Sequence, residues 1–323
     1  MRRPSSEREG REEGAGGELE LTLKPTGKAG RGGSGQGATA VGRFRIESRA
    51  GGAAYRHVPR RFKIESDRPV LVVPDVHQNM EFLERAVSRA QAEDASLIFL
   101  GDYVDAVDAQ WRNPAVLASV ARVLPELAET HAPGCVFIAG NHDVQALQVA
   151  RYRASLLIAG DEEHVAKLDA AMPLAASYAK LLGAWSQEFL RGWRLAAVAH
   201  GFLLSHAGMA RRFWPWSVAP DVEGQTRALL SEAEVAWERW LIKGEEGPLF
   251  EAGPGRGGRV APVGGPLWMD WDYEFVDDLP LPQVVGHTRG REARRKDRSW
   301  CIDASQNCVA LIERDIGLRV IKL

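Results

Sequence analysis

The chain has 323 residues, is 45% hydrophobic and 26% charged, and carries a formal net charge of −2 at pH 7. This ordinary composition supplies a sizeable core. It excludes a membrane-spanning chain, because no apolar run is long enough to cross a bilayer. The first residues lack the apolar core of a secretory signal. The three cysteines are odd in number and lack metal-type spacing, so we expect a reducing compartment and a cytoplasmic protein.

Charge is distributed unevenly along the chain. Residues 1–65 carry 14 Lys and Arg against 8 Asp and Glu, whereas the remainder carries 27 against 35. Residues 1–45 are rich in Gly, Arg, Glu and Ser without hydrophobic periodicity, which predicts a disordered tail. Residues 46–65 are interpreted as a basic linker; the alternative is an electrostatic contact with an acidic partner. Nucleic acid is not expected, because no aromatic ladder accompanies the basic residues.

The folded domain is predicted to cover residues 66–323 and to begin with alternating strands and helices. Short apolar runs predict strands, and apolar residues spaced near 3.6 predict helices. The predicted order is a strand at 69–73, a helix at 80–95, a strand at 96–100, a helix at 113–130 bent near Pro125, and a strand at 135–139. This alternation indicates βαβ units and a mostly parallel sheet.

The second half of the chain is predicted to be mixed. Residues 144–190 are rich in Ala and Leu and are expected to be largely helical, and another helix is expected over 225–242. Residues 193–208 predict two strands joined by a tight turn at His200–Gly201. Residues 244–265 form a Gly/Pro-rich loop of a length that is often functional. The short strands that follow are expected to form a second sheet, completed by the C-terminus.

Polar residues able to bind metals follow several apolar strands. They are Asp75 and His77, Asp102 and Asp105, Asn141 and His142, and then His206 and His287. In a parallel sheet the strand ends lie side by side at one edge, where such proteins place their sites. Asp, Asn and His without Cys suit Mn, Fe or Zn, and this many ligands suits two ions bridged by one carboxylate. The glycines before Asp102, Asn141 and His287 are expected to let the backbone turn sharply.

The motifs DVH, GDYVD, GNHD, SHAG, LWMD and GHT occur in this order over roughly residues 68–305. Together they resemble the calcineurin-like metallophosphoesterase superfamily, and best match its phosphoprotein-phosphatase branch and the bacterial relatives of that branch. The resemblance implies an α/β fold in which two packed mixed β-sheets are flanked by helices. It also implies a metal-dependent phosphoric ester hydrolase that uses two divalent metal ions (Mn, Fe or Zn).

The resemblance further implies a role for each motif residue. Asp75 and His77 would bind the first ion, Asp102 would bridge both ions, and Asn141, His206 and His287 would complete the second site. His142 would be the general acid that protonates the leaving group, and Asp105 would orient it. The chemistry of the residues agrees, because an imidazole beside such a site can donate a proton near neutral pH.

The chain departs from the family pattern mainly at three positions, and its third motif reads GNHD where the phosphoprotein-phosphatase branch usually has GNHE. Pro74 and Gln78 replace glycines around the first motif, and Ala106 stands where an arginine usually grips the phosphate. That charge-assisted clamp must therefore be missing or supplied by other residues. The candidates are Arg256 and Arg259 in the Gly-rich loop, and Arg289 just after GHT.

Three functions remain open on these residues. The first is a two-metal phosphatase that hydrolyses phosphomonoesters, including phosphoserine or phosphothreonine proteins, by attack of metal-bound hydroxide. The second is a hydrolase of dinucleoside polyphosphates or other nucleotides, favoured by Ala106 and by the aromatic stretch at 213–216. The third is a non-catalytic phosphate-binding module. In each case the expected partner is a phosphorylated protein or small molecule, and no membrane partner is expected.

Overall fold

The structure is a computed structural model, and it describes residues 22–25, 44–47, 67–106, 110, 112–131 and 133–323. The chain divides into two compact units, residues 1–54 and 55–323. In the first unit, β1 (Thr22–Pro25) pairs antiparallel with β2 (Phe44–Glu47). The rest of the predicted tail and linker lies outside the described residues, so the proposed domain boundaries remain a prediction.

The first sheet of the second unit has the strand order β12-β11-β3-β4-β5. Three adjacent strands of this sheet run parallel, as the alternation of elements predicts. They are β3 (Val70–Val73), β4 (Ser96–Phe99) and β5 (Cys135–Phe137). On the other side of β3, β11 (Cys308–Glu313) pairs antiparallel, and β12 (Gly317–Lys322) forms the edge. The sheet is therefore mixed.

The second sheet has the order β6-β7-β8-β10-β9. Its strands are β6 (Ala196–Ala199), β7 (Phe202–Ser205), β8 (Gln283–Val285), β9 (Arg294–Lys296) and β10 (Ser299–Cys301). The hairpin between β6 and β7 turns at His200 and Gly201 as predicted, and both residues have the positive φ that a tight hairpin turn favours.

One prediction about the sheets is wrong. The C-terminal strands do not all join the second sheet, because β11 and β12 return to the first. The physical reason is that one edge of β3 is not paired with β4. β11 pairs with this edge, and almost all residues of β11 are buried there. An apolar run predicts a buried strand, but it does not say which of two sheet edges the strand will occupy.

The two sheets pack against each other, and alternate residues of β3 show how the core is divided. Val70 and Val72 join a cluster between the sheets that includes Leu204 and Val284. The intervening Leu71 and Val73 join the larger cluster beneath the helices. Both faces of the strand are thus buried, which explains its uninterrupted apolar sequence. The predicted fold class, two mixed sheets flanked by helices, is confirmed.

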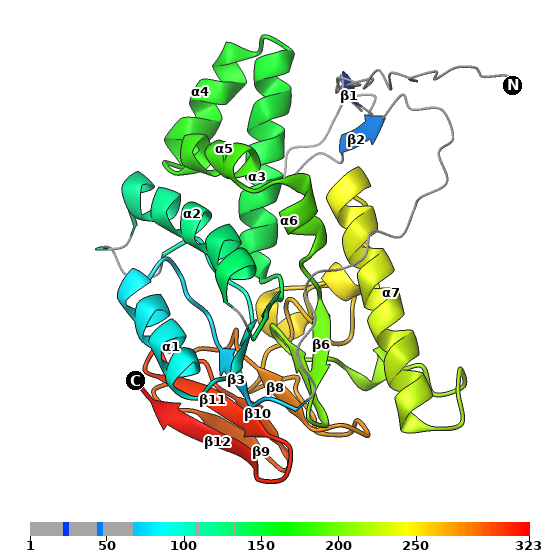
Figure 1. Cartoon of the computed structure of the whole chain (residues 1–323). Coiled ribbons are helices and arrows are strands. Elements are labelled where there is room, and N and C mark those ends of the chain that lie inside the picture. The colour runs from blue at the N-terminus through cyan, green and yellow to red at the C-terminus, as the bar shows by residue number, and fades with distance from the viewer. Residues whose placement is uncertain (1–21, 26–43, 48–66, 107–109, 111, 132) are drawn as a thin grey trace, which may run out of the picture. The chain divides into compact units, whose positions relative to one another are not determined.

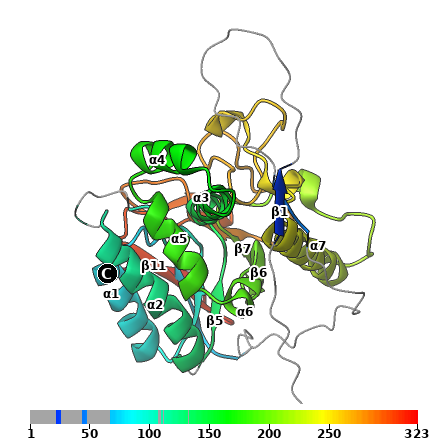
Figure 2. The same cartoon turned by 90° about the horizontal axis from the view of Figure 1, so that it is seen from above.

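Seven α-helices are described in this unit (Figure 1). They are α1 (Met80–Ala92), α2 (Pro114–Thr130), α3 (Asn141–Ile158), α4 (Glu162–Ala171), α5 (Ala175–Ala184), α6 (Gln187–Arg191) and α7 (Val222–Lys243). Short 3-10 turns cover Arg211–Phe213, Pro248–Phe250 and Pro254–Arg256. Seen from above, α5 lies between α2 and α3 (Figure 2). Within the described residues, no helix combines the length and apolar character needed to cross a membrane.

A stack of tryptophans joins the helices behind the first sheet. Trp237 of α7 lies between Trp193 and Trp240, with ring centroids 6.1 and 5.0 Å away. Trp193 also contacts the ring of Tyr103, whose hydroxyl donates to the carbonyl of Ile138 at 2.7 Å. Because Tyr103 follows β4, the stack supports the loop that carries the polar strand-end residues.

Replacing Trp237 with Ala tests the importance of this stack. Trp237 is 2% exposed and its Nε1 donates to the carbonyl of Leu190, so its loss should lower the free energy of unfolding by about 3–5 kcal/mol. Chemical denaturation measures this value. As a control, Trp216→Ala removes a ring that is 42% exposed and should cost less than about 1 kcal/mol. Similar losses for the two variants would contradict a structural role for the stack.

Candidate metal centre and catalytic site

The strand-end residues meet at a cleft of about 400 Å³. The predicted residues on its walls include His77, Asp102, Asn141, His142 and His287. The loops after β3 and β4 are joined by backbone hydrogen bonds, since the amides of Val76 and His77 donate to the carbonyl of Asp102 at 3.1 and 2.7 Å. Side chains from distant parts of the sequence are therefore held at one edge of the sheets.

Several of these residues have left-handed backbones, which cost energy for residues other than glycine. They are His77, Gln78, Asp102, Asp105 and His287, with φ between 45° and 66°. Such conformations persist only where the surrounding structure enforces them, and they are concentrated at functional sites.

The glycines before the motif residues act in two ways. Gly101 has a φ of 108° and makes the predicted sharp turn. Gly140, with a φ of −97°, does not. A Cβ at Gly140 would collide with Oδ1 of Asp102, and one at Gly286 would collide with Oδ1 of Asp75. At these two positions glycine is needed because an aspartate carboxylate lies against the backbone, so the predicted reason is wrong there.

In both His77 and His206, Nδ1 is hydrogen-bonded to a backbone carbonyl, so Nε2 is the nitrogen that faces the site. Nδ1 of His77 lies 2.9 Å from the carbonyl of Asp105, and Nδ1 of His206 lies 2.9 Å from that of Leu100. A carbonyl only accepts hydrogen bonds, so each Nδ1 carries a hydrogen. Burial lowers the pKa of both rings, that of His206 to about 4. Both rings are therefore neutral at pH 7, and each Nε2 presents a lone pair to the site.

The lone pair on Nε2 of His206 faces other acceptor atoms. Nε2 of His206 lies 2.9 Å from Oδ1 of Asn141 and 3.4 Å from Oδ2 of Asp102, which only accept hydrogen bonds. It also lies 3.1 Å from Nδ1 of His287. Nε2 of His287 is buried and has no hydrogen-bond partner among the described residues. Whichever nitrogen of His287 carries the hydrogen, one buried ring nitrogen remains unsatisfied. Electron-rich atoms converging in this way fit a bound cation.

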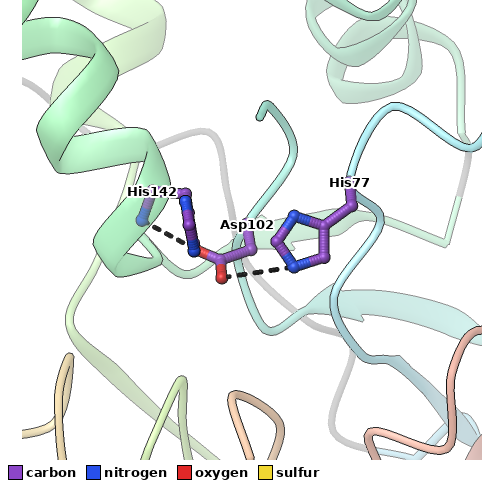
Figure 3. Close-up of side chains that lie close together, drawn as sticks. All are labelled: His77, Asp102 and His142. Atoms are coloured by element: carbon purple, nitrogen blue, oxygen red, sulfur yellow. Dashed lines mark hydrogen bonds and ion pairs between the residues drawn. The ribbon is translucent and has the colours of Figure 1, made fainter. Parts of the chain in front are cut away.

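Asp102 lies at the centre of the arrangement (Figure 3). Its Oδ1 accepts the amide of His142 at 2.9 Å, and its Oδ2 lies 3.7 Å from Nε2 of His77. Burial, together with the charge of Asp75, raises the pKa of Asp102 well above its usual range. A cation here would hold the carboxyl in its ionised form.

Two groups of donor atoms suited to a metal ion share Asp102. One contains His77, Asp102 and His142, the other Asp102, His206 and His287, and the atoms of each group lie within 4.8 Å of one another. Asp75, a predicted ligand, lies beside the first group, with its Oδ2 3.9 Å from Nε2 of His77. Its carboxylate also accepts the amide of His287 at 3.0 Å.

His142 and Asp105 form a close pair at the edge of the cleft. Nδ1 of His142 lies 2.6 Å from Oδ2 of Asp105. Burial opposes protonation of His142, but the hydrogen bond to Asp105 and the charge of Asp102 outweigh it and raise the pKa of His142 to about 9. The same hydrogen bond lowers the pKa of Asp105. The pair is an imidazole that holds a proton, oriented by an ionised carboxylate.

The sequence profile of the calcineurin-like phosphoesterases matches residues 68–287, which contain the predicted ligands and the His142–Asp105 pair. The chain belongs to the calcineurin-like phosphoesterase family. Its members are phosphoester hydrolases, and the resemblance seen in the motifs is confirmed. No curated protein matches the chain.

Solved structures that match the chain include three proteins described as phosphatases. The cold-active protein-tyrosine phosphatase of a psychrophilic Shewanella species is 13% identical, with a TM-score of 0.45 over 87% of this chain and 93% of its own. A putative diadenosine tetraphosphatase is 18% identical, with a TM-score of 0.40 over 81% and 96%. A protein serine/threonine phosphatase from Saccharomyces cerevisiae is 13% identical, with a TM-score of 0.40 over 80% and 81%.

Two of the three arginines predicted for this phosphoesterase line the cleft. Arg256 is held by Asp270, with Nε to Oδ2 at 3.0 Å, and by the hydroxyl of Thr288 at 2.9 Å. Arg289 also lines the cleft, and its Nε donates to the hydroxyl of Ser305. Arg259 is exposed and is not among the lining residues.

Two buried carboxylates at the site were not predicted. Asp143, in GNHD, accepts the backbone amides of Asp102, Tyr103 and Gly140 at 2.8–2.9 Å. It lies at the third position of α3, where an acidic side chain commonly caps the helix start. Asp303 lines the cleft, and burial together with the charge of Asp75 raises its pKa to about 8. Its position just after an apolar strand was the signal that could have identified it.

Replacing Asp143 with Asn tests whether it anchors the metal centre. The new amide group would face backbone donors and leave buried N–H groups without an acceptor, so the free energy of unfolding should fall by about 2–4 kcal/mol. Affinity for Mn²⁺ should also fall, because Asp102 loses its backbone anchor. Denaturation and calorimetric titration measure the two effects.

The matched control is Asp161→Asn at the N-cap of α4, where the carboxylate is partly exposed and accepts the amide of His164. Asn serves as well as Asp at an N-cap, so both quantities should change little. Equal effects of the two substitutions would contradict the proposed anchoring.

Proposed function

We propose that this calcineurin-like phosphoesterase is a two-metal phosphatase that hydrolyses phosphomonoesters. The observation that carries the proposal is that Asp102 lies 3.7 Å from Nε2 of His77, which Asp75 also approaches, and 3.4 Å from Nε2 of His206. His142, which lies within reach of the first group, is instead bonded through Nδ1 to Asp105 at the edge of the same cleft. Asp75, His77 and Asp102 would hold one ion, and Asp102, Asn141, His206 and His287 the other. Two divalent ions in such a site supply Lewis acidity to the phosphoryl group and lower the pKa of a bound water.

The residues of the chain would supply binding and proton transfer. Arg256 and Arg289 bring two positive charges to the cleft wall, and a guanidinium matches the geometry of a phosphate. They would replace the clamp that Ala106 cannot provide. His142 keeps one ring nitrogen for the cleft, since Nδ1 is bonded to Asp105. It would protonate the leaving alkoxide as the phosphorus–oxygen bond breaks.

The structure weakens one argument for a nucleotide hydrolase. The aromatic stretch at 213–216 does not line the cleft. Trp214 is 2% exposed, and its Nε1 donates to Gln225 at 2.7 Å. Trp216 instead stacks with Arg211. These contacts account for both rings by packing, so the 213–216 stretch gives no support to a nucleotide substrate. The tryptophan on the cleft wall is Trp268, whose ring meets that of His287 edge to face.

The first test is hydrolysis of phenyl phosphate with added Mn²⁺. Wild-type protein should be active and should lose activity to a chelator. His142→Asn should lower kcat by at least about 100-fold, the scale that general acid catalysis contributes, and Asp102→Asn should lower activity further. His164→Asn, which alters an exposed histidine on α4, should leave the rate unchanged. Equal rates for wild type, Asp102→Asn and His142→Asn would refute the proposal.

A second test separates the substrate classes. Phosphoserine and phosphothreonine peptides are compared with a dinucleoside tetraphosphate at equal concentrations. We expect at least about tenfold higher kcat/KM for the peptides, because the cleft offers two arginines for one phosphate group and no side chains of the 213–216 stretch for a base. Preference for the nucleotide would reassign the substrate. Binding of two metal equivalents without turnover of any phosphoester would favour a phosphate-binding module.

A further inference from the structure

Tyr178 of α5 reaches the His142–Asp105 pair from a helix that carries none of the sequence motifs. Its hydroxyl lies 3.4 Å from Oδ1 of Asp105. Tyr178 is 5% exposed, and its hydroxyl has no other hydrogen-bond partner in the part of the chain that the structure describes. A buried phenol normally finds a partner, and here the partner is the carboxylate that orients the general acid.

The direction of this hydrogen bond follows from the charges. Burial and the neighbouring charge of Asp105 raise the pKa of Tyr178, so the phenol keeps its hydrogen and donates it. His142 occupies Oδ2 of Asp105, so Oδ1 is the free carboxylate oxygen that accepts from the phenol. Each oxygen of Asp105 thus has its own partner: Oδ2 lies 2.6 Å from Nδ1 of His142, and Oδ1 accepts from the hydroxyl of Tyr178.

Two contacts on Asp105 restrain its carboxylate more than one contact does. If only His142 held it, the carboxylate of Asp105 could rotate together with the imidazole. The second contact, to Tyr178, fixes the plane of the carboxylate. The separation of 3.4 Å is long for a hydrogen bond between oxygens, but such bonds in ligand-free enzymes are often long and shorten in the reacting complex. Arg112 steadies the same loop, since its guanidinium donates twice to the carbonyl of Ala106.

The position of α5 in the fold explains why Tyr178 lies beside Asp105. α5 lies between α2 and α3 (Figure 2), and α3 begins with Asn141 and His142. The helix that supplies the tyrosine therefore packs on the helix that supplies the general acid.

We propose that Tyr178 is a positioning residue that fixes Asp105 and thereby aims the proton of His142 at the leaving group. This inference rests on the proposed phosphatase function. It makes α5 part of the machinery for leaving-group protonation. Because the metal centre and the arginines are untouched, Tyr178 should influence the protonation of the leaving group and not phosphate binding.

The dependence of kcat on the leaving group tests this role. An alkoxide or phenoxide of high pKa needs the proton, whereas 2,4-dinitrophenolate leaves without it. Tyr178→Phe should lower kcat for phenyl phosphate by roughly tenfold, a part of what general acid catalysis contributes. It should lower kcat for 2,4-dinitrophenyl phosphate by less than about twofold and leave KM unchanged for both. Tyr273→Phe, at a tyrosine that is 85% exposed, is the matched control and should behave as wild type.

A double-mutant cycle asks whether Tyr178 acts through Asp105. Asp105→Asn should show the same leaving-group dependence, and adding Tyr178→Phe should then change the rates by less than about twofold. The melting temperature of each variant verifies that it is folded. Equal losses on both substrates, or full additivity with Asp105→Asn, would overturn the inference. A wild-type protein that hydrolyses neither ester would instead refute the proposed function itself, so the two failures are distinguishable.

Discussion

The site depends on the way one residue, Asp102, is held. Its carbonyl accepts the amides of Val76 and His77 from the loop after β3, and its amide donates to Asp143 at the start of α3. Its side chain accepts the amide of His142 on one oxygen and faces the histidines on the other. A single residue thus fixes three strand ends relative to one another. The left-handed backbone of Asp102, with a φ of 51°, is maintained by these contacts.

This arrangement brings together carboxylates that repel each other and acceptor atoms that have no hydrogen-bond donor. Asp75 and Asp102 are both buried carboxylates, and the lone pair of His206 points at other acceptors. Such a cluster is unfavourable by itself, because buried polar groups without partners destabilise a fold. The two packed sheets and the aromatic stack supply the stability that offsets it. Cations bound at the site would relieve the same strain, so metal binding and folding should be coupled.

Sequence patterns predicted the parts of the fold and of the site that are set by residues close together in the sequence. Strands such as β3 and the positions of His77 and Asp102 follow from an apolar run ending in polar residues. The sheet chosen by β11 could not be predicted, because it depends on which edge is open after the chain has folded. The role of Gly140 was missed because it arises from the approach of another strand's carboxylate. Tyr178 was missed for the same reason: the packing of α5 places it, and its own helix carries no motif.

We propose that two metal ions share Asp102. Electron paramagnetic resonance of the protein loaded with Mn²⁺ tests it most directly, because two ions bridged by one carboxylate are magnetically coupled. The account predicts that the second equivalent of Mn²⁺ produces the spectrum of a coupled pair, and that Asp102→Asn abolishes this spectrum. Saturation at one equivalent, or two equivalents without coupling in the wild-type protein, would contradict it.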